Sequence, residues 1–181
     1  MNIFVVDYDP IEAAKALVDK HVRKMILESA QMLSMAHRYL DGSETKVVVD
    51  EKTKRHWLLE DDRLEKLLYK VSVPHLNHPC TKWSREAKEN YDWLAIHWVA
   101  LMDEYKYRYG KNHACNKLYP DLLQPPQGLT NYWGSEPPLA MPDEYKTDSV
   151  IESYRNYYRQ AKSHLHNWTK REAPEWLQKT K

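Results

Sequence analysis

The sequence has few glycines and cysteines and no long apolar run, and each shortage excludes a class of protein. Four glycines occur among 181 residues. None lies in a phosphate-cradling pattern, so common kinds of nucleotide hydrolysis are not expected. Cys80 and Cys115 are the only cysteines, and two thiols cannot build a disulfide framework. No stretch reaches the ~18 apolar residues of a membrane span, and no secretion signal is recognised. These shortages predict a cytoplasmic protein without membrane contact.

The sequence also lacks an excess of either sign of charge. The 27 lysines and arginines nearly balance the 26 acids, for a net charge of +1, so a nucleic-acid-binding face would need local clustering of cations. Phenylalanine is rare as well, with one Phe against seven Trp and thirteen Tyr. Trp and Tyr suit either a core or a surface that meets a flat, wet ligand such as a sugar or a base.

Helical patterns dominate the chain. Asp9-Pro10 is typical of a helix start, and apolar periodicity predicts an unbroken helix from there to about Leu40. A second long helix is expected from Thr81 or Ser84 to Tyr109, stopped by Gly110, and a last one over residues 148–166. We therefore expect a mainly α, compact single domain over residues 1–181, with two long packed helices and residues 169–181 as an extended tail.

The connecting segments are expected to be less regular. Val-rich residues 46–49 and residues 55–59 flank a polar turn over residues 50–54, which predicts a small β-hairpin. A short helix is expected over residues 61–71, and a loop over residues 75–80. Residues 112–123 favour a short helix interrupted at Pro120. The stretch 124–142 is rich in Pro and Gly, and its length predicts a functional or poorly ordered loop.

One polar stripe on the first helix could carry chemistry. His21, Lys24, Glu28 and Gln31 fall within an arc of about 80° on a helix. A carboxylate beside His and Lys can act as a general base, a nucleophile or a stabiliser of a cation. The same spacing also fits a solvated helix face with one Lys24–Glu28 ion pair.

Two further segments carry residue types that can bind metals or nucleic acids. His75, His78 and Cys80 could be zinc ligands, but no second Cys or His cluster has the matching spacing, so neither a metal nor a cofactor is expected. Residues 154–159 read Tyr-Arg-Asn-Tyr-Tyr-Arg. Aromatic rings interleaved with cations can stack on bases and hold phosphates, or some of the rings can pack against the first helix.

Three of these segments together resemble one known family. Leu17-Val18-Asp19-Lys20-His21, with Glu28 seven residues later, resembles the first helix of the phage pyrimidine-dimer DNA glycosylases, in which the glutamate is catalytic. Residues 78–83, leading into a long aromatic helix, resemble that family's His-x-Thr segment. Residues 154–161 resemble its aromatic-basic tail. The chain also looks like an uncharacterised phage branch of this family.

The resemblance implies a compact helical fold, DNA as the partner and the host cytoplasm as the location. It implies Glu28 as the central acid, with His21 nearby and His78 at the entrance of the second helix as further catalytic candidates. Gln31 and Trp83 are our own candidates for the pocket. For DNA contact it implies Tyr154, Arg155, Tyr157 and Tyr158, and the cations Lys20, Lys24, Lys82 and Arg159 are further candidates. In the family the nucleophile is the amine exposed when Met1 is removed. Asn2 is too bulky for that removal, so here the amine is expected on Met1.

Several functions stay open on the sequence. The first is excision of a pyrimidine base from DNA, with Glu28 stabilising positive charge on the sugar or activating a nucleophile. The second is a phage DNA-modification transferase that places an amino acid or amine on an activated thymine-type base. A third is a non-catalytic accessory protein that binds nucleic acid or a host protein, and a fourth is a small-molecule enzyme with an aromatic pocket.

Overall fold

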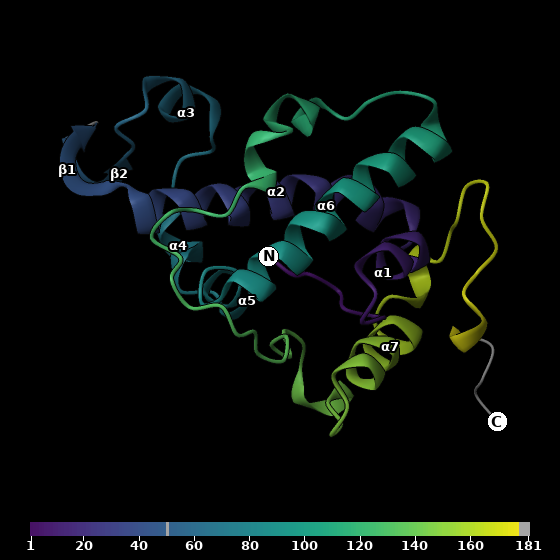
Figure 1. Cartoon of the computed structure of the whole chain (residues 1–181). Helices are drawn as coiled ribbons and strands as arrows, with labels where there is room; N and C mark the ends of the chain where they lie inside the picture. The colour runs from purple at the N-terminus through teal and green to yellow at the C-terminus, as the bar shows by residue number, and fades with distance from the viewer. Residues whose placement is uncertain (50, 178–181) are drawn as a thin grey trace.

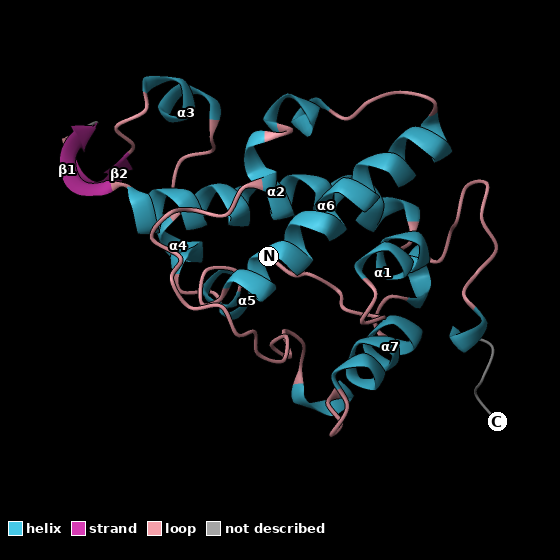
Figure 2. Cartoon of the chain, viewed as in Figure 1, coloured by secondary structure: helices cyan, strands magenta, loops and turns pink. Residues whose placement is uncertain are grey.

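The computed structural model describes residues 1–49 and 51–177. It confirms a mostly helical, compact fold with one two-stranded sheet (Figures 1 and 2). The α-helices are α1 (Pro10–Ala16), α2 (Asp19–Asp41), α3 (Asp62–Leu67), α4 (Val73–Leu76), α5 (Pro79–Trp83), α6 (Lys88–Tyr109) and α7 (Val150–Gln160). The strands are β1 (Ser43–Val49) and β2 (Lys52–Leu58), and short 3-10 helices include η1 (Ala114–Leu118) and η2 (Asp121–Leu123). None of the helices among the described residues is both long and apolar enough to span a bilayer.

Helices α2 and α6 are the two long helices of the prediction, and they pack against each other (Figure 1). Their contact faces place Met25, Leu33, Leu94 and Trp98 in one hydrophobic core, and burial of such side chains supplies the main driving force for folding. Helix α1 packs on α6.

The predicted unbroken helix from Asp9 to Leu40 is wrong. The chain leaves the helical conformation at Leu17 and Val18, which are both extended, and so divides α1 from α2. The cause is tertiary. The buried Arg108 guanidinium of α6 donates to the carbonyls of Lys15 and Leu17 and pairs with Asp19 in the first turn of α2. These contacts satisfy the groups that a helix break would leave without partners.

The hairpin is confirmed, with β1 and β2 antiparallel and Ser43 opposite Leu58. Its strands extend further than predicted, because Lys52–Lys54 belong to β2 rather than to the turn. Asp50, the first residue of the predicted turn, lies outside the described residues. The buried Arg38 of α2 donates to the Trp57 carbonyl and thereby ties the hairpin to the helix.

The predicted loop over residues 75–80 is partly wrong, because α4 ends and α5 begins inside it. The second long helix is also divided. Ala87 is extended, and α6 starts at Lys88, whose amide donates to the Asn131 carbonyl of the Pro-rich loop. That loop supplies a cap from about 40 residues away in the chain, which a local sequence pattern does not reveal.

The remaining segments follow the prediction in outline. The short helix predicted over residues 61–71 is found as α3, which ends earlier, at Leu67. Residues 112–123 hold η1 and η2 on either side of Pro120. The last helix, α7, ends at Gln160 rather than near His166. Of the predicted tail, Thr169 bonds to Asp19 and Arg171 to Glu104, so residues 169–171 are docked on α2 and α6. Residues 178–181 lie outside the described residues.

Candidate functional site at the chain's amino terminus

Glu28 of α2 receives the first residues of the chain. Its Oε2 accepts a hydrogen bond from the Asn2 backbone N–H at 3.1 Å and lies 3.8 Å from the Met1 amine. Its Oε1 lies 3.1 Å from the Lys24 ammonium, one helical turn earlier. The Glu28 side chain is only 13% exposed, so two cations and an amide stabilise a mostly shielded carboxylate.

The amino-terminal segment is held by the Asn2 side chain. Its Oδ1 accepts from the amides of Ile3 at 2.7 Å and Phe4 at 2.9 Å, while its Nδ2 donates to the Ala140 carbonyl at 2.8 Å. Phe4 has a left-handed φ of 45°, a conformation that non-glycine residues rarely adopt. The side chain of Asn2 therefore fixes a tight bend that directs the Met1 amine to Glu28.

Helix α5 forms a second wall of the site. The Thr81 hydroxyl lies 3.5 Å from the Met1 sulfur, and the Met1 side chain is 4% exposed. His78 precedes the helix and accepts from the Cys80 amide through Nδ1, so its neutral ring carries the proton on Nε2. Burial, followed by the nearby Met1 ammonium, lowers the pKa of His78, and burial raises the pKa of the Cys80 thiol to about 12. Both groups are therefore neutral near pH 7.

His21 occupies a different place from Glu28, although both lie on α2. Its ring stacks on Phe4 with centroids 4.2 Å apart, and its Nδ1 lies 2.5 Å from the Tyr158 hydroxyl. The ring is buried, and burial together with nearby lysines lowers the pKa of His21 to about 3. His21 thus supports the bend at Phe4 as a neutral group.

The other residues predicted for the pocket and for DNA contact fall into two groups. Lys20 and Lys82 are exposed and form no ion pair within the described residues, while Lys24 is paired with Glu28. Gln31 is half-buried. Trp83 is buried, and its indole donates to the Ser135 carbonyl of the Pro-rich loop. The lysines offer charge to a polyanion, whereas Trp83 anchors the loop.

The aromatic-basic segment on α7 faces mostly inward. Tyr154 and Tyr158 are fully buried, and Tyr154 donates to the Pro138 carbonyl, so neither ring offers a surface to DNA here. Arg155 lies 3.6 Å from Asp7, and Arg159 lies 3.2 Å from Glu152. Tyr157 stays half-buried. The sequence left open whether these rings stack on bases or pack inside the protein, and Tyr154 and Tyr158 pack inside it.

One cation near His21 is missing from the predicted set. The Lys162 ammonium lies 4.6 Å from the centroid of the Tyr157 ring, and its charge contributes to the low pKa of His21. Aromatics and cations alternate over residues 154–159, and Lys162 lies three positions beyond that run. It is the next cation in the sequence, which is the signal that could have found it.

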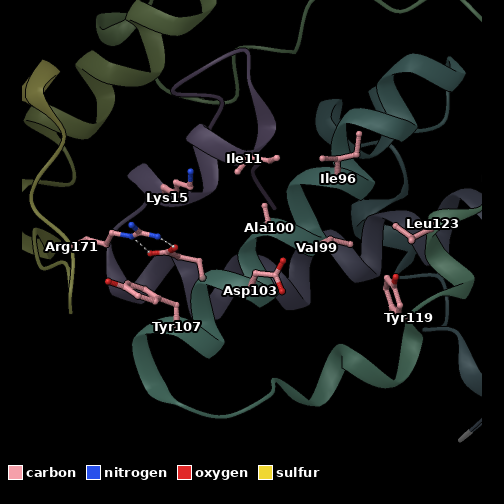
Figure 3. Close-up of a pocket in the computed structure, with 11 residues that line it drawn as sticks. Ile11, Lys15, Ile96, Val99, Ala100, Asp103, Tyr107, Tyr119, Leu123 and Arg171 are labelled. Carbon is pink, nitrogen blue, oxygen red and sulfur yellow. Dashed lines mark hydrogen bonds and ion pairs between the residues drawn. The ribbon is translucent and has the colours of Figure 1, made fainter.

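Two of the predicted residues, Lys82 and Trp83, line a hollow of about 330 Å³ beside the Pro-rich loop. Within residues 1–49 and 51–177, no group of three or more His, Cys, Asp or Glu side chains is placed to hold a metal ion. A pocket of about 500 Å³ opens between α1 and α6, and none of the predicted site residues lines it (Figure 3).

With this geometry in place, comparison with known proteins supplies the family. Residues 1–117, about two thirds of the chain, match the family model for pyrimidine dimer DNA glycosylase. The chain belongs to the pyrimidine dimer DNA glycosylase family. The matched part contains Glu28, His21, His78, Lys82 and Trp83, whereas residues 154–159 lie beyond it. No curated protein and no solved structure gives a match. Family membership supports a DNA-acting function of the pyrimidine-dimer-glycosylase kind.

Proposed function

We propose that this member of the pyrimidine dimer DNA glycosylase family excises a pyrimidine base from DNA, with Glu28 as its central acid. The observation that supports this most is the Met1 amine 3.8 Å from the shielded Glu28 carboxylate, with the neutral His78 imidazole close enough for both charges to act on its pKa. Residues 1–2, α2 and the start of α5 supply these groups. A base in a duplex must leave the stack before such a site can reach its sugar.

The proposed reaction uses the Met1 amine as the nucleophile. The Met1 ammonium first gives up a proton, for which the Glu28 carboxylate at 3.8 Å is the adjacent acceptor. The amine nitrogen then bonds to C1′ of the sugar while the glycosidic bond breaks, and the bonding electron pair leaves with the base, which takes up a proton. Glu28 passes this proton on to solvent, and its carboxylate then stabilises the positive charge that builds on the sugar. Breakage of the C1′–O4′ bond, with a proton going to O4′, turns the C1′–N bond into an iminium that borohydride can reduce. Loss of a C2′ proton from the iminium expels the 3′ phosphate and breaks the strand. Retention of Met1 would leave this amine available.

Exposed cations around the site would position the DNA. Lys20 on α2 and Lys82 on α5 form no ion pair in the described part of the chain, so their ammonium groups are available to phosphates. Arg155 and Arg159 have acidic partners already, and they would contact DNA only by exchanging those partners. The lysines on the two helices that frame Glu28 are therefore the proposed phosphate contacts.

The test is excision from a duplex that contains a pyrimidine dimer. The wild-type chain should cleave the strand at the dimer, and borohydride should trap a covalent complex whose DNA is attached to the Met1 peptide. Glu28→Gln should lower the rate by at least about 100-fold, the range of a general acid or base. Glu12→Gln is the matched control, because Glu12 forms an exposed helix pair with Lys15, and it should keep the wild-type rate.

Other outcomes would favour the other functions. Intact strands with an altered nucleoside mass would replace excision with transfer of an amine or amino acid to the base. DNA binding without any chemical change, unaffected by Glu28→Gln, would point to an accessory binding protein. Excision that persists undiminished in folded Glu28→Gln would overturn the role proposed for the carboxylate.

A further inference from the structure

The pocket between α1 and α6 has the character of a small-molecule site. Its volume is about 500 Å³, and Ile11 of α1, Val99 and Ala100 of α6 and Leu123 of η2 form its apolar walls (Figure 3). Small-molecule sites are typically hollows of about 300–1,000 Å³ with mostly apolar walls and a few polar groups that fix orientation.

Apolar surface at the pocket is open to water. Ile11 is 45% exposed, Ile96 is 47% exposed and Tyr119 is 50% exposed, although a surface helix normally turns such side chains inward. Covering this surface with an apolar ligand body would be favourable, at about 25 cal/mol per Å² removed from water.

The charged side chains at the pocket favour a ligand of one sign of charge. Lys15 is paired with Glu12, and Arg171 is paired with Glu104. Asp103, by contrast, lies between the Arg171 and Tyr119 ends of the pocket in Figure 3 and forms no ion pair within the described residues. The charge left without a partner is therefore negative, and an anionic ligand would meet no free cation.

We propose that this pocket binds a small organic cation, a primary ammonium carried on an apolar body. The ammonium would contact the Asp103 carboxylate, and the body would lie along Val99 and Ala100. Tyr119 would add the electron-rich ring that attracts cations. This binding is independent of DNA excision, because the pocket shares no residue with the Glu28 site.

The test compares three probes that differ in one terminal group: 4-phenylbutylammonium, the neutral 4-phenylbutanol and the anionic 4-phenylbutyrate. Calorimetry on the full chain should give a dissociation constant at least 10-fold lower for the ammonium than for the alcohol, and the weakest binding for the carboxylate. Amide chemical shifts should change along residues 96–104 and 119–123 when the ammonium is added, and not around Glu28. Equal affinities for the three probes, or shifts confined to another surface, would overturn the proposal.

Variants separate the charge from the cavity. Asp103→Asn should raise the ammonium's dissociation constant to that of the alcohol and leave alcohol binding unchanged. Asp148→Asn removes another exposed carboxylate that has no ion-pair partner among the described residues, and it should keep the preference for the ammonium. Ala100→Trp should fill the pocket and abolish binding of both, with circular dichroism to verify its fold. An unchanged ammonium preference in Asp103→Asn would refute the assigned contact whatever Ala100→Trp does.

Discussion

At the scale of single residues, Glu28 and His21 of α2 have different surroundings. Glu28 meets the Met1 amine, whereas His21 lies under Phe4 and beside Tyr158. The sequence pattern placed both on one stripe of a helix, and it could not separate them because burial depends on what packs above the stripe. That cover comes from residues 4 and 158, far apart in the sequence.

The buried, neutral state of His21 has a consequence for stability. Its pKa is about 3 in the folded chain, below the ~6.5 of an unfolded histidine. Between these values the unfolded chain binds the extra proton, so stability is complete above pH 6.5 and falls as the pH drops toward 3. Between pH 7 and pH 5 we expect the wild type to lose about 2 kcal/mol more unfolding free energy than His21→Gln, which lacks this titrating group.

Urea denaturation of both chains at the two pH values measures this difference. His164→Gln is the control, because His164 is exposed, and it should keep the pH dependence of the wild type. His97 is buried and also has a lowered pKa, of about 4, so a residual dependence remains in His21→Gln. If His21→Gln and the wild type lose equal stability between pH 7 and pH 5, the neutral state of buried His21 is disproved.

At the scale of elements, periodicity predicted which segments are helical better than where the helices stop. The ends at Asp41 and Tyr109 follow from Gly42 and Gly110, and Gly110 adopts the left-handed conformation that suits a helix end. The breaks at Leu17–Val18 and at Ala87 have no glycine or proline. They exist because Arg108 and the Asn131 carbonyl bind the exposed helix ends from elsewhere in the fold.

Arg108 should therefore stabilise the α1–α2 junction strongly. Its guanidinium is fully buried and bridges Asp19 and Glu104 while it caps α1. Arg108→Met leaves these acids without that cation, and removal of one partner from a buried ion pair costs about 3–5 kcal/mol. The free energy of unfolding, measured with urea at pH 7, should fall by that amount.

Arg63→Met offers the matched comparison. Arg63 makes an equally direct two-point contact with Asp121, but at the surface, where water and salt weaken the attraction. Its urea midpoint should hardly move. If both variants lost similar amounts of unfolding free energy, burial would not make the Arg108 ion pairs stronger than the surface pair of Arg63.

At the scale of the whole molecule, the site joins parts of the chain that no local pattern connects. Residues 1–2, Glu28, His78, Thr81 and the Ala140 carbonyl come from four separated segments. Glu28 and His78 could be named from the sequence because the motifs that contain them resemble those of the family. The sequence could not show that the Asn2 side chain bends the chain back toward Glu28, since that bend depends on the Ala140 carbonyl and on the packing of Phe4.

The near-neutral net charge makes the distribution of cations decisive for DNA binding. If Lys20 and Lys82 contact phosphates, each releases about one counterion on binding, so Lys20→Gln and Lys82→Gln should each weaken duplex binding and flatten the slope of log K against log salt by about one. Lys66→Gln is the control, because Lys66 is also exposed and unpaired within the described residues but lies on α3, which Figure 1 shows above the carboxyl-terminal part of α2, away from the chain's amino terminus. Fluorescence anisotropy with a labelled duplex at several salt concentrations gives all four slopes. A footprint centred on Glu28 covers the lysines of α2 and α5 but not Lys66 of α3. If Lys66→Gln lost as much DNA affinity and salt dependence as the other two variants, the DNA would therefore not be centred on Glu28.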